Sequence, residues 1–177
     1  MGSAYFHEDD YCQVEVLPFA ARKGCLAEMG RIDGFAEAHR DGAGFTDIYV
    51  RAEPPLPLAS LGITLPEVES ALGPLAPRFV QVLTGYSSYR EPCPSVAGWG
   101  FNDSQAVFAS VGGGGVVGPV WLSVHGVSTE HAGAWCHLLR SLPRAAELLV
   151  ADWSARQLVP LADESRVAAY LRGDADA

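Results

Sequence analysis

Residues 5–17 read Tyr-Phe-His-Glu-Asp-Asp-Tyr-Cys-Gln-Val-Glu-Val-Leu, and they show how the chain begins to fold. From Cys12 to Val16 apolar and polar residues alternate, which places Glu15 on the polar face. Such alternation is typical of a strand with one buried face. The pattern predicts a strand over residues 11–17, and Tyr5 to Asp10 form an acidic and aromatic lead-in to it.

The rest of the chain mixes helical and strand patterns. Apolar spacing and capping residues predict helices over residues 19–39, 65–73, 129–142 and 164–172. Gly34 favours a kink or break in the first of them. Apolar runs predict further strands over residues 45–51, 78–86, 99–102, 106–111, 116–125, 147–153 and 157–161. The strand at 78–86 is apolar on both faces, so we expect it to be central.

This order of elements indicates an α+β fold. Several strands follow one another closely enough to form hairpins, so we expect a mostly antiparallel sheet with helices packed mainly on one face. The length of 177 residues fits one globular domain spanning 1–177. We expect residues 1–4 and 174–177 to be frayed.

The charge of the chain is strongly acidic. It has 21 acidic and 12 basic residues, which gives a formal net charge of -9. A field of this sign repels phosphate backbones, so we do not expect nucleic-acid binding. It favours a basic partner or a cationic ligand, although an acidic surface also serves solubility alone.

Neither a membrane span nor a secretory leader is expected. No window of about 18 apolar residues occurs, and no basic segment followed by an apolar run stands at the start. The four cysteines are widely spaced and include no CxxC pair, as in proteins whose cysteines are reduced and buried. We therefore expect a cytoplasmic location and no membrane association.

Three catalytic or ligand-binding motifs are incomplete. Residues 113–118 match the GxGxxG string, but a proline and a valine-rich strand follow where a dinucleotide site needs a helix. Ser87 follows a strand, yet Tyr89 stands where a nucleophile elbow needs glycine. His131 and His137 are six positions apart on a helix and cannot bind one ion from one face.

The lead-in is the best candidate for chemistry. His7, Glu8, Asp9 and Asp10 are consecutive, and Glu8 and Asp10 would point the same way in an extended segment. Carboxylates beside a histidine suit a metal or a general acid–base site, with His7, Asp9 and Asp10 as the candidate metal ligands. The alternative is a solvated segment that leads into a strand. We assign no catalytic residue, no metal ligand and no cofactor.

Partner binding is the other use of these residues. Tyrosine, tryptophan and arginine carry much of the energy of protein interfaces, and acidic patches steer basic partners. The candidate partner-binding residues are Tyr5, His7, Glu8, Asp9, Asp10, Tyr86, Tyr89, Arg90 and Trp99. Ordinary core packing is the alternative for the aromatic members.

Three strings resemble parts of small cytoplasmic bacterial proteins of unassigned function. They are the opening at 5–13, Gly-Phe-Thr-Asp-Ile-Tyr-Val at 44–50, and Leu-Val-Ala-Asp-Trp at 149–153 with Val-Pro-Leu at 159–161. Some of these proteins resemble immunity proteins of polymorphic-toxin systems. The resemblance covers the two ends better than the middle and implies an acidic protein that neutralises a cognate toxin.

Our leading hypothesis is therefore a protein-binding protein, with a basic toxin domain as its partner, rather than an enzyme. One alternative is a small enzyme or metal-binding protein that uses residues 7–10. Another is a small-molecule binding module with a pocket near Trp99, Tyr86 and Trp121. The sequence does not specify the partner or the oligomeric state.

Overall fold

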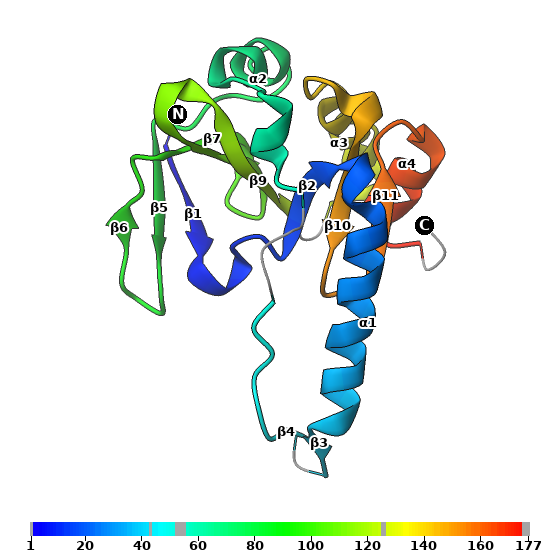
Figure 1. Ribbon diagram of the computed structural model, residues 1–177. Helices are drawn as coiled ribbons and strands as arrows, with labels where there is room; N and C mark the ends of the chain where they lie inside the picture. Colours follow the sequence, from blue (N-terminus) through cyan, green and yellow to red (C-terminus); the bar gives the residue numbers. More distant parts are fainter. Residues whose placement is uncertain (1, 43, 52–55, 125–126, 175–177) are drawn as a thin grey trace.

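The computed structural model describes residues 2–42, 44–51, 56–124 and 127–174 (Figure 1). Its helices are α1 (Arg22–Ala38), α2 (Leu65–Leu72), α3 (Thr129–Arg140) and α4 (Glu164–Arg172). Its strands are β1 (Ser3–His7), β2 (Val14–Pro18), β3 (Arg40–Asp41), β4 (Gly44–Phe45), β5 (Gln81–Gly85), β6 (Glu91–Pro92), β7 (Val96–Asn102), β8 (Gln105–Val111), β9 (Val117–Val124), β10 (Leu148–Asp152) and β11 (Gln157–Pro160). Short 3-10 turns are η1 (Glu8–Asp10), η2 (Phe19–Ala21), η3 (Leu58–Leu61), η4 (Gly113–Gly115) and η5 (Ala145–Glu147).

The main sheet has six strands in the order β11-β10-β2-β9-β8-β7. All of its neighbouring pairs are antiparallel. Hairpins supply five of the six strands: β8–β9 and β10–β11, which the sequence predicts, and β7–β8. β2 lies between β10 and β9. The predicted mostly antiparallel α+β fold is confirmed.

A second, three-stranded sheet has the order β1-β5-β6. β1 and β5 are parallel, and Ser3 pairs with Gln81 while His7 pairs with Gly85. Residues 3 and 4, expected at the frayed N-terminal end, are the first two of β1, and Ala4 is fully buried. The strand predicted over 78–86 is the middle strand of this small sheet.

The two faces of the main sheet are covered differently. Val16, Leu148 and Val150 face a core that α2, α3 and α4 share. On the opposite face, Leu17 and Leu149 pack against Cys25 and Met29 of α1. Beside α1, the small sheet covers Phe108 and Trp121 through Ala4, Phe6 and Val82. Three of the four helices in the described residues thus share one face, as the sequence predicts.

An arm extends from the body where α1 and the chain that follows it project downwards in Figure 1. α1 continues through Gly34, so the predicted break there is wrong. The strand predicted over 45–51 is also wrong beyond β4, because none of the strands in the described part of the chain pairs with residues 46–51. Ile48 and Val50 consequently remain exposed.

Local capping signals gave the helix ends correctly. Thr64 and Glu67 form the predicted capping box at the start of α2. Asp163 caps α4, and Gly173 ends it in the left-handed conformation. These signals work because each one lies within a few residues of the helix end that it stabilises.

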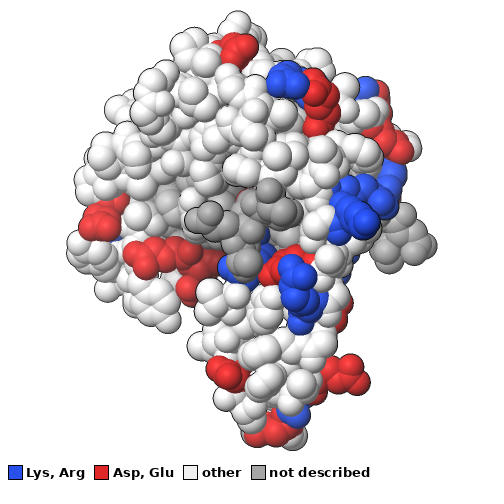
Figure 2. Space-filling view, in the orientation of Figure 1, with Lys and Arg blue, Asp and Glu red and all other residues white. Residues whose placement is uncertain are grey.

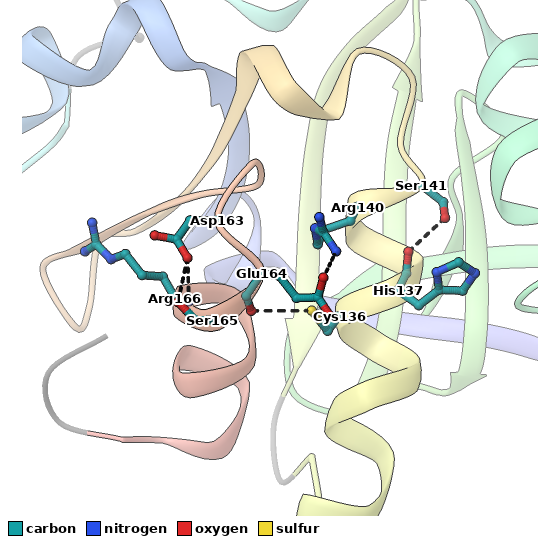
Figure 3. A network of polar contacts seen from close by, with 8 residues as sticks. All are labelled: Cys136, His137, Arg140, Ser141, Asp163, Glu164, Ser165 and Arg166. Atoms are coloured by element: carbon teal, nitrogen blue, oxygen red, sulfur yellow. Dashed lines mark hydrogen bonds and ion pairs between the residues drawn. The ribbon is translucent and has the colours of Figure 1, made fainter.

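The start of α4 also docks onto α3 (Figure 3). Arg140 of α3 forms an ion pair with Glu164, and the Cys136 thiol lies 3.8 Å from the Glu164 carbonyl oxygen. In the same turn the Asp163 carboxylate accepts hydrogen bonds from the Ser165 hydroxyl at 2.7 Å and from the Arg166 N–H at 3.1 Å.

We predict that the Asp163 cap gives a stability contribution that depends on pH. Two hydrogen bonds lower the pKa of Asp163. The larger effect comes from the Ser165 hydroxyl and the smaller from the backbone N–H of Arg166. The contribution is therefore complete above the unfolded pKa of about 3.9, and it is lost as pH falls through the lower folded pKa. At neutral pH we expect Asp163→Ala to lower the Tm by about 2–4 °C.

The control for this cap is Asp163→Asn, which keeps an oxygen acceptor but cannot ionise. Its Tm difference from Asp163→Ala should not change with pH. Thermal melts of the three proteins at neutral and strongly acidic pH measure both effects. If the Tm of Asp163→Ala lies below that of the wild type by the same amount at both pH values, the prediction is contradicted.

Candidate functional site

The small sheet brings the acidic lead-in beside a loop some 80 residues away in sequence. Because β1 and β5 are parallel, they end at the same edge, where His7 lies opposite Gly85. η1 follows β1 there, and the loop Tyr86–Arg90 follows β5. We call Glu8, Asp9, Asp10, Tyr86, Tyr89 and Glu91 the acidic–aromatic edge.

Several contacts fix the loop against β1. The Arg90 guanidinium lies 3.1 Å from the centroid of the Tyr5 ring, and the Tyr5 hydroxyl donates to the Gly85 carbonyl at 2.9 Å. The rings of His7 and Tyr86 are 5.0 Å apart. Gly85 has a φ of +148°, and a Cβ there would lie 2.2 Å from the Tyr89 carbonyl oxygen. Only glycine allows this close return of the loop.

The acidic–aromatic edge is open to solvent. Tyr86 and Tyr89 are each 61% exposed, and Glu8, Asp9 and Asp10 are exposed as well. Acidic side chains gather at the lower left of the body in Figure 2, below the ends of β1 and β5 in Figure 1. The Tyr89 hydroxyl donates to Glu91, and this carboxylate raises the pKa of Tyr89. The edge therefore joins negative charge to exposed aromatic rings.

Trp99 does not belong to this edge. It is 0% exposed and packs in the main core, so the prediction that it binds a partner is wrong. Trp99 lies within β7, where the strand predicted over 99–102 is found, and its side chain faces the core. Trp121 is buried as well, which removes two of the three residues around which we expected a small-molecule pocket.

The candidate metal ligands do not converge. η1 is a 3-10 turn, so the extended segment in which Glu8 and Asp10 would point the same way is not formed. His7 Nδ1 accepts from the Asp9 N–H at 3.2 Å and lies 3.5 Å from the Asp9 carboxylate. Within the described ranges, no three His, Cys, Asp or Glu side chains are placed to hold a metal ion. His125, the last residue of the strand predicted over 116–125, lies outside the described residues.

A second group of polar residues has no recognisable signal in the sequence. Glu15 is only 3% exposed although the strand pattern assigned it to the polar face. Its Oε1 atom accepts hydrogen bonds from Arg51 and from the Trp153 indole N–H, both at 2.8 Å. The Arg51 guanidinium also lies 4.2 Å from the centroid of the Trp153 ring. We call these three residues the Glu15–Arg51–Trp153 group.

The turn before β2 completes this group. Cys12 has a φ of +55°, which is uncommon for a residue other than glycine, and its carbonyl accepts from Arg51 at 3.1 Å. Burial raises the pKa of the Cys12 thiol to about 12. Burial and the neighbouring Cys12 raise the pKa of Tyr11 to about 12 as well. These groups therefore stay protonated at neutral pH and act as hydrogen-bonding groups rather than nucleophiles.

Burial also perturbs the pKa of Glu15. Removal from water raises it, while Arg51 and Trp153 act in the opposite direction. A pocket of about 360 Å³ opens beside this carboxylate. Perturbed ionisable groups beside a pocket are a recognised sign of a functional site, so the Glu15–Arg51–Trp153 group is a second candidate site.

Comparison with known proteins offers no guide to either site, so both sites are interpreted from their geometry. No protein-family model, no curated protein and no solved structure matches this chain. Among the described helices, none combines the length and the apolar character that crossing a membrane requires.

Proposed function

We propose that this protein binds a basic protein partner through the acidic–aromatic edge, and that it acts as an immunity protein against a toxin. The proposal rests on the assembly of exposed Tyr86 and Tyr89 with three exposed acids from a distant segment. Exposed tyrosines supply rigid contact area, and acids beside them speed association with a basic surface.

The shape of the edge suits this role. Its loop is held by the Arg90–Tyr5 contact and the Tyr5–Gly85 hydrogen bond, so little order has to be gained on binding. A preformed surface binds more tightly because less conformational entropy is lost. The net charge of -9 extends the attraction beyond the edge itself.

The test uses the basic protein encoded next to this gene as the partner. Co-expression should yield a complex whose affinity falls as salt is raised, because ions screen exposed charges. Asp9→Lys/Asp10→Lys should weaken binding about tenfold or more, mainly through slower association. If the partner is a toxin, co-expression with this protein should also restore growth of the host cells.

The matched control is Glu130→Lys/Asp174→Lys, which changes the net charge equally on exposed residues outside the edge. It should leave the affinity within about threefold of the wild type. Equal weakening by both double variants would show that net charge alone attracts the partner. That result, or failure to form a complex, would reject the proposal.

A further inference from the structure

The pocket beside Glu15 is separate from the acidic–aromatic edge, and the inference below does not depend on the function proposed for that edge. Apolar residues of β2, η3 and the start of β9 form most of its wall, among them Leu17, Pro57, Leu58 and Pro119. Tyr11, Cys12, Glu15 and Arg51 supply its polar groups. A volume of about 360 Å³ lies at the lower end of the range for small-molecule sites.

Arg51 is more accessible from this pocket than its ion-pair partner Glu15. Its side chain is 22% exposed, whereas that of Glu15 is 4% exposed. The two hydrogen bonds to Glu15 Oε1 and the Cys12 carbonyl use two of the five N–H groups of a guanidinium. Trp153 fixes the plane of the guanidinium from one side. Arg51 is therefore held in place and keeps donors for an acceptor in the pocket.

The charge of the pocket is already balanced. Arg51 and Glu15 form an ion pair at 2.8 Å, and the remaining wall is mostly apolar. A charged ligand would lose its hydration without gaining an unpaired counter-charge, which is costly in such surroundings. An uncharged molecule with a carbonyl oxygen and an adjacent N–H matches an arginine donor next to a carboxylate acceptor.

The backbone at Cys12 supports a built site rather than an accidental hollow. The left-handed conformation of a residue with a side chain costs free energy, and such residues are concentrated at functional sites. Here the conformation turns the Cys12 carbonyl to Arg51 and so fixes the guanidinium beside the pocket.

We infer that this pocket binds a small, uncharged, planar molecule that carries an amide-type group, with its carbonyl oxygen on Arg51 and its ring against the apolar wall. A nucleobase, a lactam or an aromatic carboxamide has this chemistry. The ring would lie beside Leu58 and Pro119, and the amide N–H would face the Glu15 carboxylate.

Three probes of nearly equal size and shape test the charge requirement. They are benzamide, benzoate and benzamidinium, which are neutral, anionic and cationic at neutral pH. Titration followed by protein-detected NMR should give a Kd on the order of 1 mM for benzamide, as expected for so small a ligand. Benzoate and benzamidinium should bind at least about tenfold more weakly.

A pair of variants tests the location. Ala59 is exposed and lines the pocket, so Ala59→Trp should fill it without disturbing the core and should abolish benzamide binding. Ala162→Trp places the same side chain at an exposed position outside the pocket and should leave the Kd unchanged. Tighter binding of benzoate or benzamidinium, equal loss in both variants, or no binding of benzamide would each overturn the inference.

Discussion

Glu15→Ala is expected to lower the free energy of unfolding by about 3 kcal/mol. The substitution leaves the Arg51 guanidinium and the Trp153 indole N–H without the acceptor that both share. Removing one partner of a buried ion pair typically costs about 3–5 kcal/mol, because the other charge stays buried and unpaired. We expect the lower end of that range because Arg51 retains some contact with water. Urea denaturation measures the difference.

The control for Glu15 is Glu69→Ala, which breaks the exposed ion pair with Arg78. Exposed pairs contribute little, so this variant should differ from the wild type by less than about 0.5 kcal/mol. A loss below about 1 kcal/mol in Glu15→Ala would show that the Glu15–Arg51–Trp153 group does not hold the fold together.

The free energy of unfolding should also depend on pH through the Glu15 carboxyl group. Because burial raises its pKa, the folded protein binds a proton more tightly than the unfolded chain does. The contribution of Glu15 to stability should therefore decrease as pH rises from the ordinary glutamate pKa, about 4.3, towards the raised value. Glu15→Gln cannot ionise and should lack this decrease.

Gly100→Ala should destabilise the protein by about 3 kcal/mol or prevent folding. A Cβ at Gly100 would lie 2.2 Å from the Gln105 carbonyl oxygen and 2.7 Å from Ala106 Cα. Both atoms belong to the backbone of β8, which a tight turn joins to β7, so neither can move away easily. The register of the two strands also shifts here, between Gly100 and Asn102. Thermal and urea unfolding measure the effect.

Gly113→Ala is the matched control, because nothing lies within 4 Å of a Cβ built there. This glycine begins the GxGxxG string, whose first three residues form the turn η4 and whose last two residues begin β9, so no helix follows the string. We expect a change of less than about 0.5 kcal/mol. Similar losses in the two variants would contradict the steric explanation.

Elements with local signals could be predicted from the sequence. Asp163 and Gly173 stand at the two ends of α4, and Thr64 with Glu67 starts α2. The hairpin of β10 and β11 also has its turn and both its strands within a few residues. Each of these signals acts over a short distance, so the residues that decide the element are neighbours in sequence.

Elements that depend on distant partners were predicted less well. Residues 46–51 alternate like a strand, but no strand pairs with them among the residues that the structure describes. β1 was interpreted as a lead-in because its partner β5 lies far along the chain. The alternation correctly places Glu15 on the other face of the strand from Val14 and Val16. It does not show that Arg51 and Trp153 cover that polar face and bury the Glu15 carboxylate.

The candidate site was predicted in part for the same reason. The exposed tyrosines, the acids and Arg90 come from the two predicted segments, which the parallel pairing of β1 and β5 brings together. The strand predicted over 99–102 does not show which way Trp99 points; its side chain faces the core, and Gly98 and Gly100 let β7 pack closely against Phe108 and Ala106. The Glu15–Arg51–Trp153 group has no sequence motif, since its members are spread over three segments.

The pairing of β1 with β5 also has a consequence for the order of folding. Every residue of β1 lies 78 positions from its partner in β5, from Ser3 with Gln81 to His7 with Gly85. Closing so long a loop costs chain entropy before any contact repays it, so such pairing forms slowly. The hairpins of the main sheet can form earlier. Newly made chains would therefore acquire the acidic–aromatic edge after the local hairpins, and binding through that edge, as proposed above, would require β1 to have paired with β5.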